Sequence, residues 1–413
     1  MTRTTLRCGA VSLAAFALTG TTMTWAQTRT IFAPQVGLAY GWTDNVAFVD
    51  TGTNADTSDS YGSLSLLLPV TRKLRTGQLQ VAYALGYVRY LDVEDLNYAD
   101  HRLSFGLSLA PDRNSSFTVS ANYALTQQQG DPSTSADPGF FLSERTKREA
   151  GTLTLGYQRG FGSGARWQWG IDVGATVFRF DEIEGVTDPM APLPLQEKNA
   201  YYGTTHLARN ITRRTAIGLL YGHRRYELSD VATEDVDEAA VTLTHQFTEA
   251  FGMGLNLGYF TRSQDPVDVE DDSGTRFGLT FNYNRPVGPV KLGFGATVDP
   301  SSGGALEGTS TDTTVSLDIA RGDSGRTWNW GGALRFTRRD PTDPAFENID
   351  TRGVSAYVEA KAHERLGFRL AFSRTRQTSD DPLLEGEVNQ GTLVAVWYPL
   401  GHAPVERAET KGE

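Results

Sequence analysis

Charged side chains recur at alternate positions within several segments of this sequence, so each segment presents them on one side of an extended strand. The basic members are Arg276, Lys291, Arg335, Lys361 and Arg369, and the acidic members are Asp172, Asp318 and Glu359. Guanidinium and ammonium groups bind carboxylate and sulfate groups, so a water-filled bore with this basic excess is predicted to favour anions. The alternative is pairing across strands, because Glu359 faces Arg369 if the turn between them covers 362–366.

Three aromatic residues are predicted on the same inward side, namely Phe178, Phe260 and Tyr357. Aromatic faces stack on the C–H faces of sugar rings, which would suit a path for a glycan. The alternative is an error of one residue in the strand phase, because all three lie near strand ends.

Patterns typical of catalysis or metal binding are weak. Gly322-Asp323-Ser324-Gly325 looks like a serine-protease string but falls in a short turn without a His–Asp context. Asp268 to Gly274 resembles part of a calcium loop, although its glycine is one place late. The six histidines are scattered without ligand spacing. The sequence therefore predicts no enzyme, no metal site and no cofactor.

The elements that carry these residues are predicted to be strands. In 276–285, Phe277, Leu279, Phe281 and Tyr283 alternate with small or polar residues. Eighteen such segments start near Phe32, Tyr61, Gln78, His101, Phe117, Arg148, Ala165, Lys198, Arg214, Asp237, Gly252, Gly274, Pro289, Thr311, Thr327, Thr351, Leu366 and Val388. Each is long enough to cross a bilayer as a tilted strand, whereas no apolar run is long enough for a membrane-spanning helix.

The connections between these segments alternate in length. Short connections such as 71–77 and 209–213 are basic, whereas long ones such as 263–273 are acidic. This rhythm predicts consecutive hairpins with the tight turns at one end and the large loops at the other. The fold class is therefore all-β, a transmembrane antiparallel up-and-down β-barrel of about 18 strands. A barrel of 16 strands is the alternative, because the pairs near 198–226 are the least clear.

Aromatic residues are predicted to gather near both ends of the strands, as lipid headgroups select. Trp167, Trp169, Tyr283, Trp328, Trp330 and Trp397 fall near the turns, and Trp42, Tyr87, Tyr226 and Tyr259 fall near the long loops.

The first 26 residues have a basic start, a short apolar core from Cys8 to Gly20 and small residues before Gln27. They are predicted to form a cleaved signal peptide, with a short buried helix as the alternative. The barrel is expected over 27–401 and a polar tail over 402–413, with the protein in the cell outer membrane among lipid and lipopolysaccharide. A net charge of −11 argues against nucleic acid as a partner, and a single Cys excludes a disulfide framework.

Near the start of the barrel, Tyr40-Gly41-Trp42-Thr43-Asp44-Asn45-Val46 resembles a signature of the β-barrel porins that occur with exopolysaccharide export systems. The resemblance implies an outer-membrane conduit for an exopolysaccharide, working with periplasmic and inner-membrane export components. The alternative is a general or solute-specific diffusion porin for small solutes, and a structural or adhesive barrel is a third possibility.

Two long loops are candidates for narrowing the bore. Loop 128–146 carries two prolines and the apolar run Phe140-Phe141-Leu142, and loop 181–197 carries Met190 to Leu195. Either loop could fold inward. The alternative is that both face solvent or lipopolysaccharide.

Overall fold

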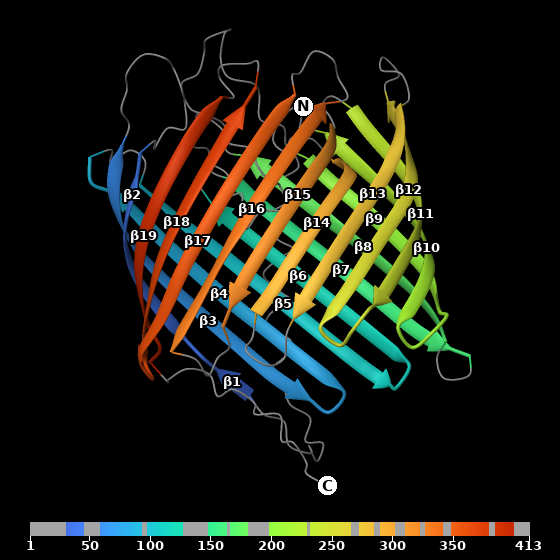
Figure 1. The fold of residues 1–413 in the computed structure, drawn as a ribbon, viewed down its shortest axis with the longest axis horizontal. Helices are drawn as coiled ribbons and strands as arrows, with labels where there is room; N and C mark the ends of the chain where they lie inside the picture. The colour runs from blue at the N-terminus through green and yellow to red at the C-terminus, as the bar shows by residue number, and fades with distance from the viewer. Residues whose placement is uncertain are drawn as a thin grey trace, which may run out of the picture.

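The computed structural model is an antiparallel β-barrel with strongly tilted strands (Figure 1). It describes residues 30–44, 58–92, 97–126, 148–162, 166–180, 198–228, 232–265, 272–284, 290–301, 310–322, 327–341, 348–379 and 385–399. The predicted signal peptide, 1–26, and the polar tail, 402–413, lie outside these residues and stay predictions. Within the described ranges, no helix is long and apolar enough to cross a membrane.

The strands follow one another along the chain with few residues between them on one side of the barrel. The first ten are β1 (Thr30–Phe32), β2 (Gln35–Thr43), β3 (Asp59–Leu74), β4 (Gly77–Tyr90), β5 (Tyr98–Asp112), β6 (Ser115–Thr126), β7 (Arg148–Phe161), β8 (Trp167–Phe180), β9 (Lys198–Asn210) and β10 (Thr215–Leu228). The others are β11 (Ala232–Gln246), β12 (Phe251–Asp265), β13 (Asp272–Asn284), β14 (Val290–Ser301), β15 (Ser310–Arg321), β16 (Trp328–Pro341), β17 (Ile349–His363), β18 (Leu366–Thr378) and β19 (Gly386–Trp397).

The sheet closes on itself. Each strand from β2 onward pairs with the next one, and β19 pairs with β2, with Trp397 opposite Val36 and Gln390 opposite Thr43. The predicted barrel of eighteen strands is confirmed, and the segments near 198–226 form the paired strands β9 and β10. Closure gives the backbone of each strand from β2 to β19 two hydrogen-bonded neighbours, as hydrocarbon requires.

The additional strand β1 continues β2 toward the bottom of Figure 1. Phe32 lies opposite Val70 of β3, and the Ala33 amide donates to the Pro69 carbonyl at 3.3 Å. Pro34 has no amide hydrogen to donate to a ladder. We therefore regard β1 and β2 as one barrel strand that is interrupted at Ala33-Pro34.

The two ends of the barrel differ as the connection lengths predict. The turns 75–76, 113–114, 211–214, 247–250 and 364–365 lie at the bottom of Figure 1, which we call the turn end, and the opposite end is the loop end. In one turn, the Asp112 carboxylate accepts hydrogen bonds from the Asn114 amide at 2.7 Å and from the Ser115 hydroxyl at 2.9 Å.

Large apolar side chains are exposed on one face of the strands. Leu38 is 62% exposed, Leu219 is 61% exposed and Leu370 is 60% exposed. Such exposure is unfavourable in water but favourable against lipid, so this face is the outer one. A closed barrel with an apolar outer face is an outer-membrane protein, as predicted.

Aromatic residues flank the apolar band at both ends. The turn-end group predicted from the sequence lies on the outer face, as do Trp42, Tyr87 and Tyr259 at the loop end. Tyr226 is a correction. It is 7% exposed and packs inside the barrel against Val236 and Phe260. The phase of β10 places it on the lumen side, while Tyr221 on the same strand faces outward.

Candidate functional site in the barrel lumen

Side chains that face the lumen alternate with the exposed apolar ones, because successive residues of a strand point to opposite faces. On β17, Val354 and Val358 are exposed outward, so Tyr357, Glu359 and Lys361 point inward. On β18, Leu370 is exposed outward, so Arg369 points inward. The same alternation, applied to each strand of the barrel, shows whether a candidate side chain faces the lumen or the lipid.

All eight charged candidates lie on the inner face. They are Asp172 on β8, Arg276 on β13, Lys291 on β14, Asp318 on β15, Arg335 on β16, Glu359 and Lys361 on β17, and Arg369 on β18. The five basic residues therefore belong to the wall from β13 to β18. Lys291, Asp318 and Arg369 are exposed to the lumen.

Glu359 and Arg369 are direct cross-strand neighbours, as the sequence predicts. Their predicted charge pairing, however, is not among the ion pairs within 4.0 Å in the described part of the chain. The Arg369 guanidinium lies instead over the ring of Tyr357, 4.3 Å from its centroid. A guanidinium over an aromatic face is favourable and keeps its N–H groups for other partners.

Arg276, in contrast to Arg369, forms ion pairs with carboxylates of other strands. Its Nε lies 2.6 Å from Asp299 Oδ1, and its Nη1 lies 2.8 Å from Glu238 Oε2. For this residue the alternative of pairing across strands is correct, and its charge is compensated within the wall.

A larger set of charged residues surrounds Arg276 at the loop end of the lumen. We call it the loop-side charge cluster; it consists of Arg224, Glu234, Glu238, Arg262, Arg276, Asp299, Asp312 and Arg339. Its members come from every strand from β10 to β16, and four of them are acidic and four are basic. Apart from Arg276, none of these residues is predicted as a lumen residue from the sequence.

Two contacts of this cluster join strands that are not neighbours, namely Arg276 of β13 with Glu238 of β11 and Arg262 of β12 with Ser310 of β15. The Arg262 Nε lies 2.9 Å from Glu234 Oε1, and its Nη2 donates to the Ser310 carbonyl of β15 at 2.9 Å. The Ser310 hydroxyl then donates to Asp312, which lies 3.1 Å from the Arg339 guanidinium. Polar contacts therefore run from β11 to β16 across the inner surface.

The inward residues of this cluster on β11 could not be recognised from the sequence, because this strand carries acidic residues on both faces. In β11, Glu234 and Glu238 point inward, whereas Asp235 and Asp237 point outward. A segment in which acidic residues occupy both faces has no clear polar side, and only the adjoining apolar alternation from Ala239 onward fixes its phase.

Burial differs between the two ends of the lumen. At the loop end, Glu234 is 1% exposed, Glu238 is 2% exposed and Arg262 is 4% exposed. At the turn end, Lys291 and Arg369 are exposed although they also point inward. The lumen is therefore filled by side chains at the loop end, next to the loop-side charge cluster, and is open to water at the turn end.

The predicted sugar-stacking aromatics all point inward, so the predicted phase holds for each of them. Phe260 is a correction in another respect, since its ring is 2% exposed and packs in the cluster with Tyr226 and Val236. It offers no free face to a sugar. One ring face of Tyr357 holds Arg369, and Phe178 lies under the Arg148 guanidinium at 5.0 Å.

Glycines on the inner face allow large side chains to lie flat along the wall. The Tyr202 ring covers Gly174, and a Cβ added at Gly174 would lie 2.6 Å from the Leu153 carbonyl oxygen. Tyr61 covers Gly41 in the same way and reaches Thr392 of β19 with a hydrogen bond of 2.8 Å. These contacts keep bulky rings out of the centre of the lumen.

The predicted plug loops, 128–146 and 181–197, lie outside the described residues. Among the residues that are described, no three His, Cys, Asp or Glu side chains come together so as to hold a metal ion.

Several solved structures are similar to this chain in fold. Among them are OpdQ of Pseudomonas aeruginosa, with a TM-score of 0.45, 9% identity, and coverage of 89% of this chain and 97% of that one. OccK2 (OpdF) of the same organism, solved in complex with glucuronate, has a TM-score of 0.45, 13% identity and coverage of 89% and 98%. OccAB4 of Acinetobacter baumannii has a TM-score of 0.43, 10% identity and coverage of 91% and 98%.

No protein-family model matches the chain, and no curated protein matches its sequence.

Proposed function

We propose that this chain is a passive outer-membrane channel for small hydrophilic solutes. The proposal rests mainly on the loop-side charge cluster, whose buried ion pairs occupy the lumen next to β10–β16. A small solute needs only the remaining water-filled space. A sugar polymer would have to thread past these side chains, and separating buried ion pairs is costly.

Export of an exopolysaccharide, the function implied by the resemblance, has less support from the lumen. A glycan path is expected to offer several free aromatic faces. Phe260 is buried, and the ring of Tyr357 carries the Arg369 guanidinium. The small-solute channel is therefore the better interpretation.

Within this proposal, we expect a preference for anions. Lys291 and Arg369 point inward and are exposed, and neither forms an ion pair within 4.0 Å among the described residues. Asp318 is the exposed acidic residue on the same wall, and it offsets only part of their field.

The proposal can be tested with the purified protein in lipid vesicles. Swelling in isotonic monosaccharide, disaccharide and tetrasaccharide solutions should slow steeply with solute size. A swelling rate that is the same for all of them would contradict a narrowed channel. In cells, a deletion strain should take up small solutes more slowly and keep its surface polysaccharide. Loss of the polysaccharide with unchanged uptake would instead favour export.

A further inference from the structure

Two arginines face each other directly on the outer wall near the loop end. Arg352 of β17 lies opposite Arg376 of β18, and both side chains are exposed. We call them the outer arginine pair. Like charges directly opposite each other on neighbouring strands destabilise a sheet unless an anion lies between or beside them.

The nearby carboxylates are engaged with other residues. Glu387 lies 2.7 Å from the Arg374 guanidinium, and Asp340 lies 2.8 Å from Arg338. Neither Arg352 nor Arg376 forms an ion pair within 4.0 Å among the residues that the structure describes.

Two other acidic residues at this height are also accounted for. Asp350 lies opposite Arg338 in the ladder. Asp44 accepts a hydrogen bond from the Asn389 backbone amide at 2.7 Å. The one acidic register partner of the outer arginine pair in the described wall is Glu387, which lies opposite Arg376 on β19 and forms its ion pair with Arg374. One carboxylate thus faces three outward arginines, and the positive charge of Arg352 and Arg376 is only partly compensated.

The outer arginine pair lies at the boundary of the apolar band of the outer face. Val354 is the next outward residue below Arg352 and is 46% exposed, and Phe372 lies two outward positions below Arg376 and is 49% exposed. The pair thus lies directly above the apolar band, where the headgroups of the outer leaflet begin.

We propose that Arg352 and Arg376 bind a phosphate group of a phosphorylated glycolipid in the outer leaflet. A phosphate oxygen pair accepts two parallel N–H bonds from a guanidinium, and one phosphate can serve two guanidinium groups. Binding would replace the repulsion between the arginines with two attractive contacts. The membrane also presents this group at the height where the pair lies.

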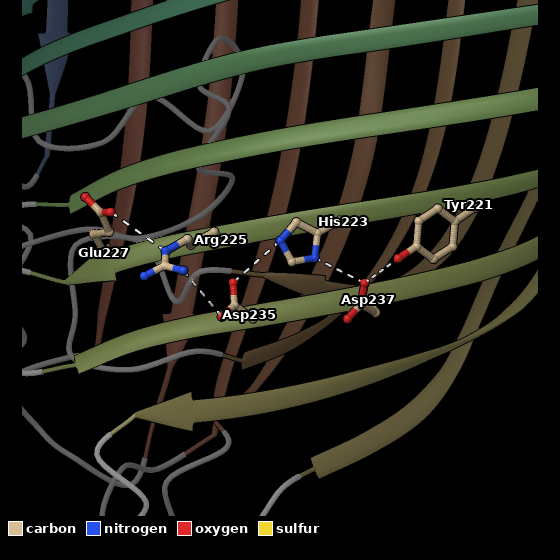
Figure 2. A network of polar contacts seen from close by, with 6 residues as sticks. All are labelled: Tyr221, His223, Arg225, Glu227, Asp235 and Asp237. Carbon is tan, nitrogen blue, oxygen red and sulfur yellow. Dashed lines mark hydrogen bonds and ion pairs between the residues drawn. The ribbon is translucent and has the colours of Figure 1, made fainter.

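Another part of the outer wall shows how a cation is compensated without a ligand (Figure 2). Arg225 of β10 lies 3.9 Å from Asp235 and 3.8 Å from Glu227. In the same network, His223 lies 3.1 Å from Asp237, which also accepts a hydrogen bond from the Tyr221 hydroxyl at 2.7 Å. Arg225 is therefore an outward arginine of similar height that needs no lipid anion, and it serves as a matched control.

The test is titration of the detergent-purified barrel with diphosphoryl lipid A and with dephosphorylated lipid A, followed by native mass spectrometry. We expect the double variant R352Q/R376Q to bind diphosphoryl lipid A at least about tenfold more weakly than the wild type, because charge-assisted hydrogen bonds are lost. The control R225Q should stay within about twofold of the wild type. Dephosphorylated lipid A should not distinguish the variants.

The lysine variant R352K/R376K keeps the charges but loses the planar forks, so its affinity should lie between those of the wild type and the glutamine variant. Folding of every variant is checked by comparing the migration of unheated and heated samples in denaturing gels. If the double glutamine variant does not fold, R376Q alone is measured, with an expected loss of at least about threefold.

Equal binding of diphosphoryl lipid A by the wild type and R352Q/R376Q would overturn the proposal. Equally tight binding of dephosphorylated lipid A would do the same. Displacement of lipid A by equimolar inorganic phosphate would show a site for free anions and overturn the lipid assignment.

Discussion

The Arg262 guanidinium lies 2.9 Å from the Glu234 carboxylate, and both side chains are buried within the lumen, with 3% and 1% exposed. A buried ion pair is tolerated when its remaining polar atoms are also bonded. Arg262 meets part of this requirement through its hydrogen bond to the Ser310 carbonyl. The pair therefore connects β11 and β12 with β15 and holds the wall of the narrowed region together.

Removing one member of this pair is expected to destabilise the barrel strongly. Glu234→Ala leaves the Arg262 charge buried without its carboxylate, which should lower the free energy of unfolding by about 3–5 kcal/mol. The measurement is urea-induced unfolding in lipid vesicles, followed by tryptophan fluorescence.

The matched control for that prediction lies on the same strand. Asp237 is an outward member of β11 whose side chain is 48% exposed, so Asp237→Ala should cost no more than about 1 kcal/mol. Equal costs for the two substitutions would contradict a special role for the buried pair.

Reversing charge at the open end of the lumen should change ion selectivity. Lys291→Glu and Arg369→Glu, made together, convert two exposed basic groups into acidic ones. In a tenfold salt gradient, the reversal potential should move toward cation preference by a sizeable part of the ~59 mV of an ideally selective pore. Arg225→Glu on the outer wall is the control and should leave the potential nearly unchanged. A wild-type channel that already prefers cations would refute the expected anion preference.

A side chain at Gly174 should disturb the wall. A Cβ there would lie 2.6 Å from the Leu153 carbonyl oxygen and would also meet the Tyr202 ring, so Gly174→Ala should destabilise the barrel by about 1–3 kcal/mol. Gly353 of β17 also faces inward, yet nothing lies within 4 Å of a Cβ added to it. Gly353→Ala should therefore be close to neutral in the same unfolding measurement, and a similar loss for both variants would argue against the crowding.

Tryptophans at the two ends of the barrel should report the lipid boundary. Trp42 is 45% exposed at the loop end and Trp397 is 50% exposed at the turn end, both outward. Variants that keep one of the two as the single tryptophan should be quenched more by lipids brominated near the headgroup than by lipids brominated near the chain end. Quenching only by a water-soluble agent would place these residues outside the membrane.

The fold could be predicted because the sequence of each strand alternates between apolar residues, which face lipid, and small or polar residues, which face the lumen. Residues such as Phe277 and Leu279 alternate with small or polar neighbours, and lipid on one side and water on the other enforce that pattern. The same alternation placed Asp318 and Arg369 on the inner face without any knowledge of their neighbours.

The partners within the lumen could not be predicted in this way. Arg262 reaches Glu234, which is two residues from its direct register partner Val236, and it also reaches Ser310 of β15. Such contacts depend on the stagger between strands and on the curvature of the wall, and neither is encoded in the alternation of a single strand. Tyr226 was assigned to the outer band for the same reason, because its place near a strand end was clear but its side was not.

The pairing of β19 with β2 joins the last strand of the barrel to the first long one. During biogenesis, the cylinder therefore cannot be sealed until the ribosome has finished almost the entire polypeptide. Until then the amino-terminal edge stays open and must be shielded from other chains. A product that stops short of Gly386 would lack β19 and keep two such open edges, so loss of this single strand is expected to prevent assembly.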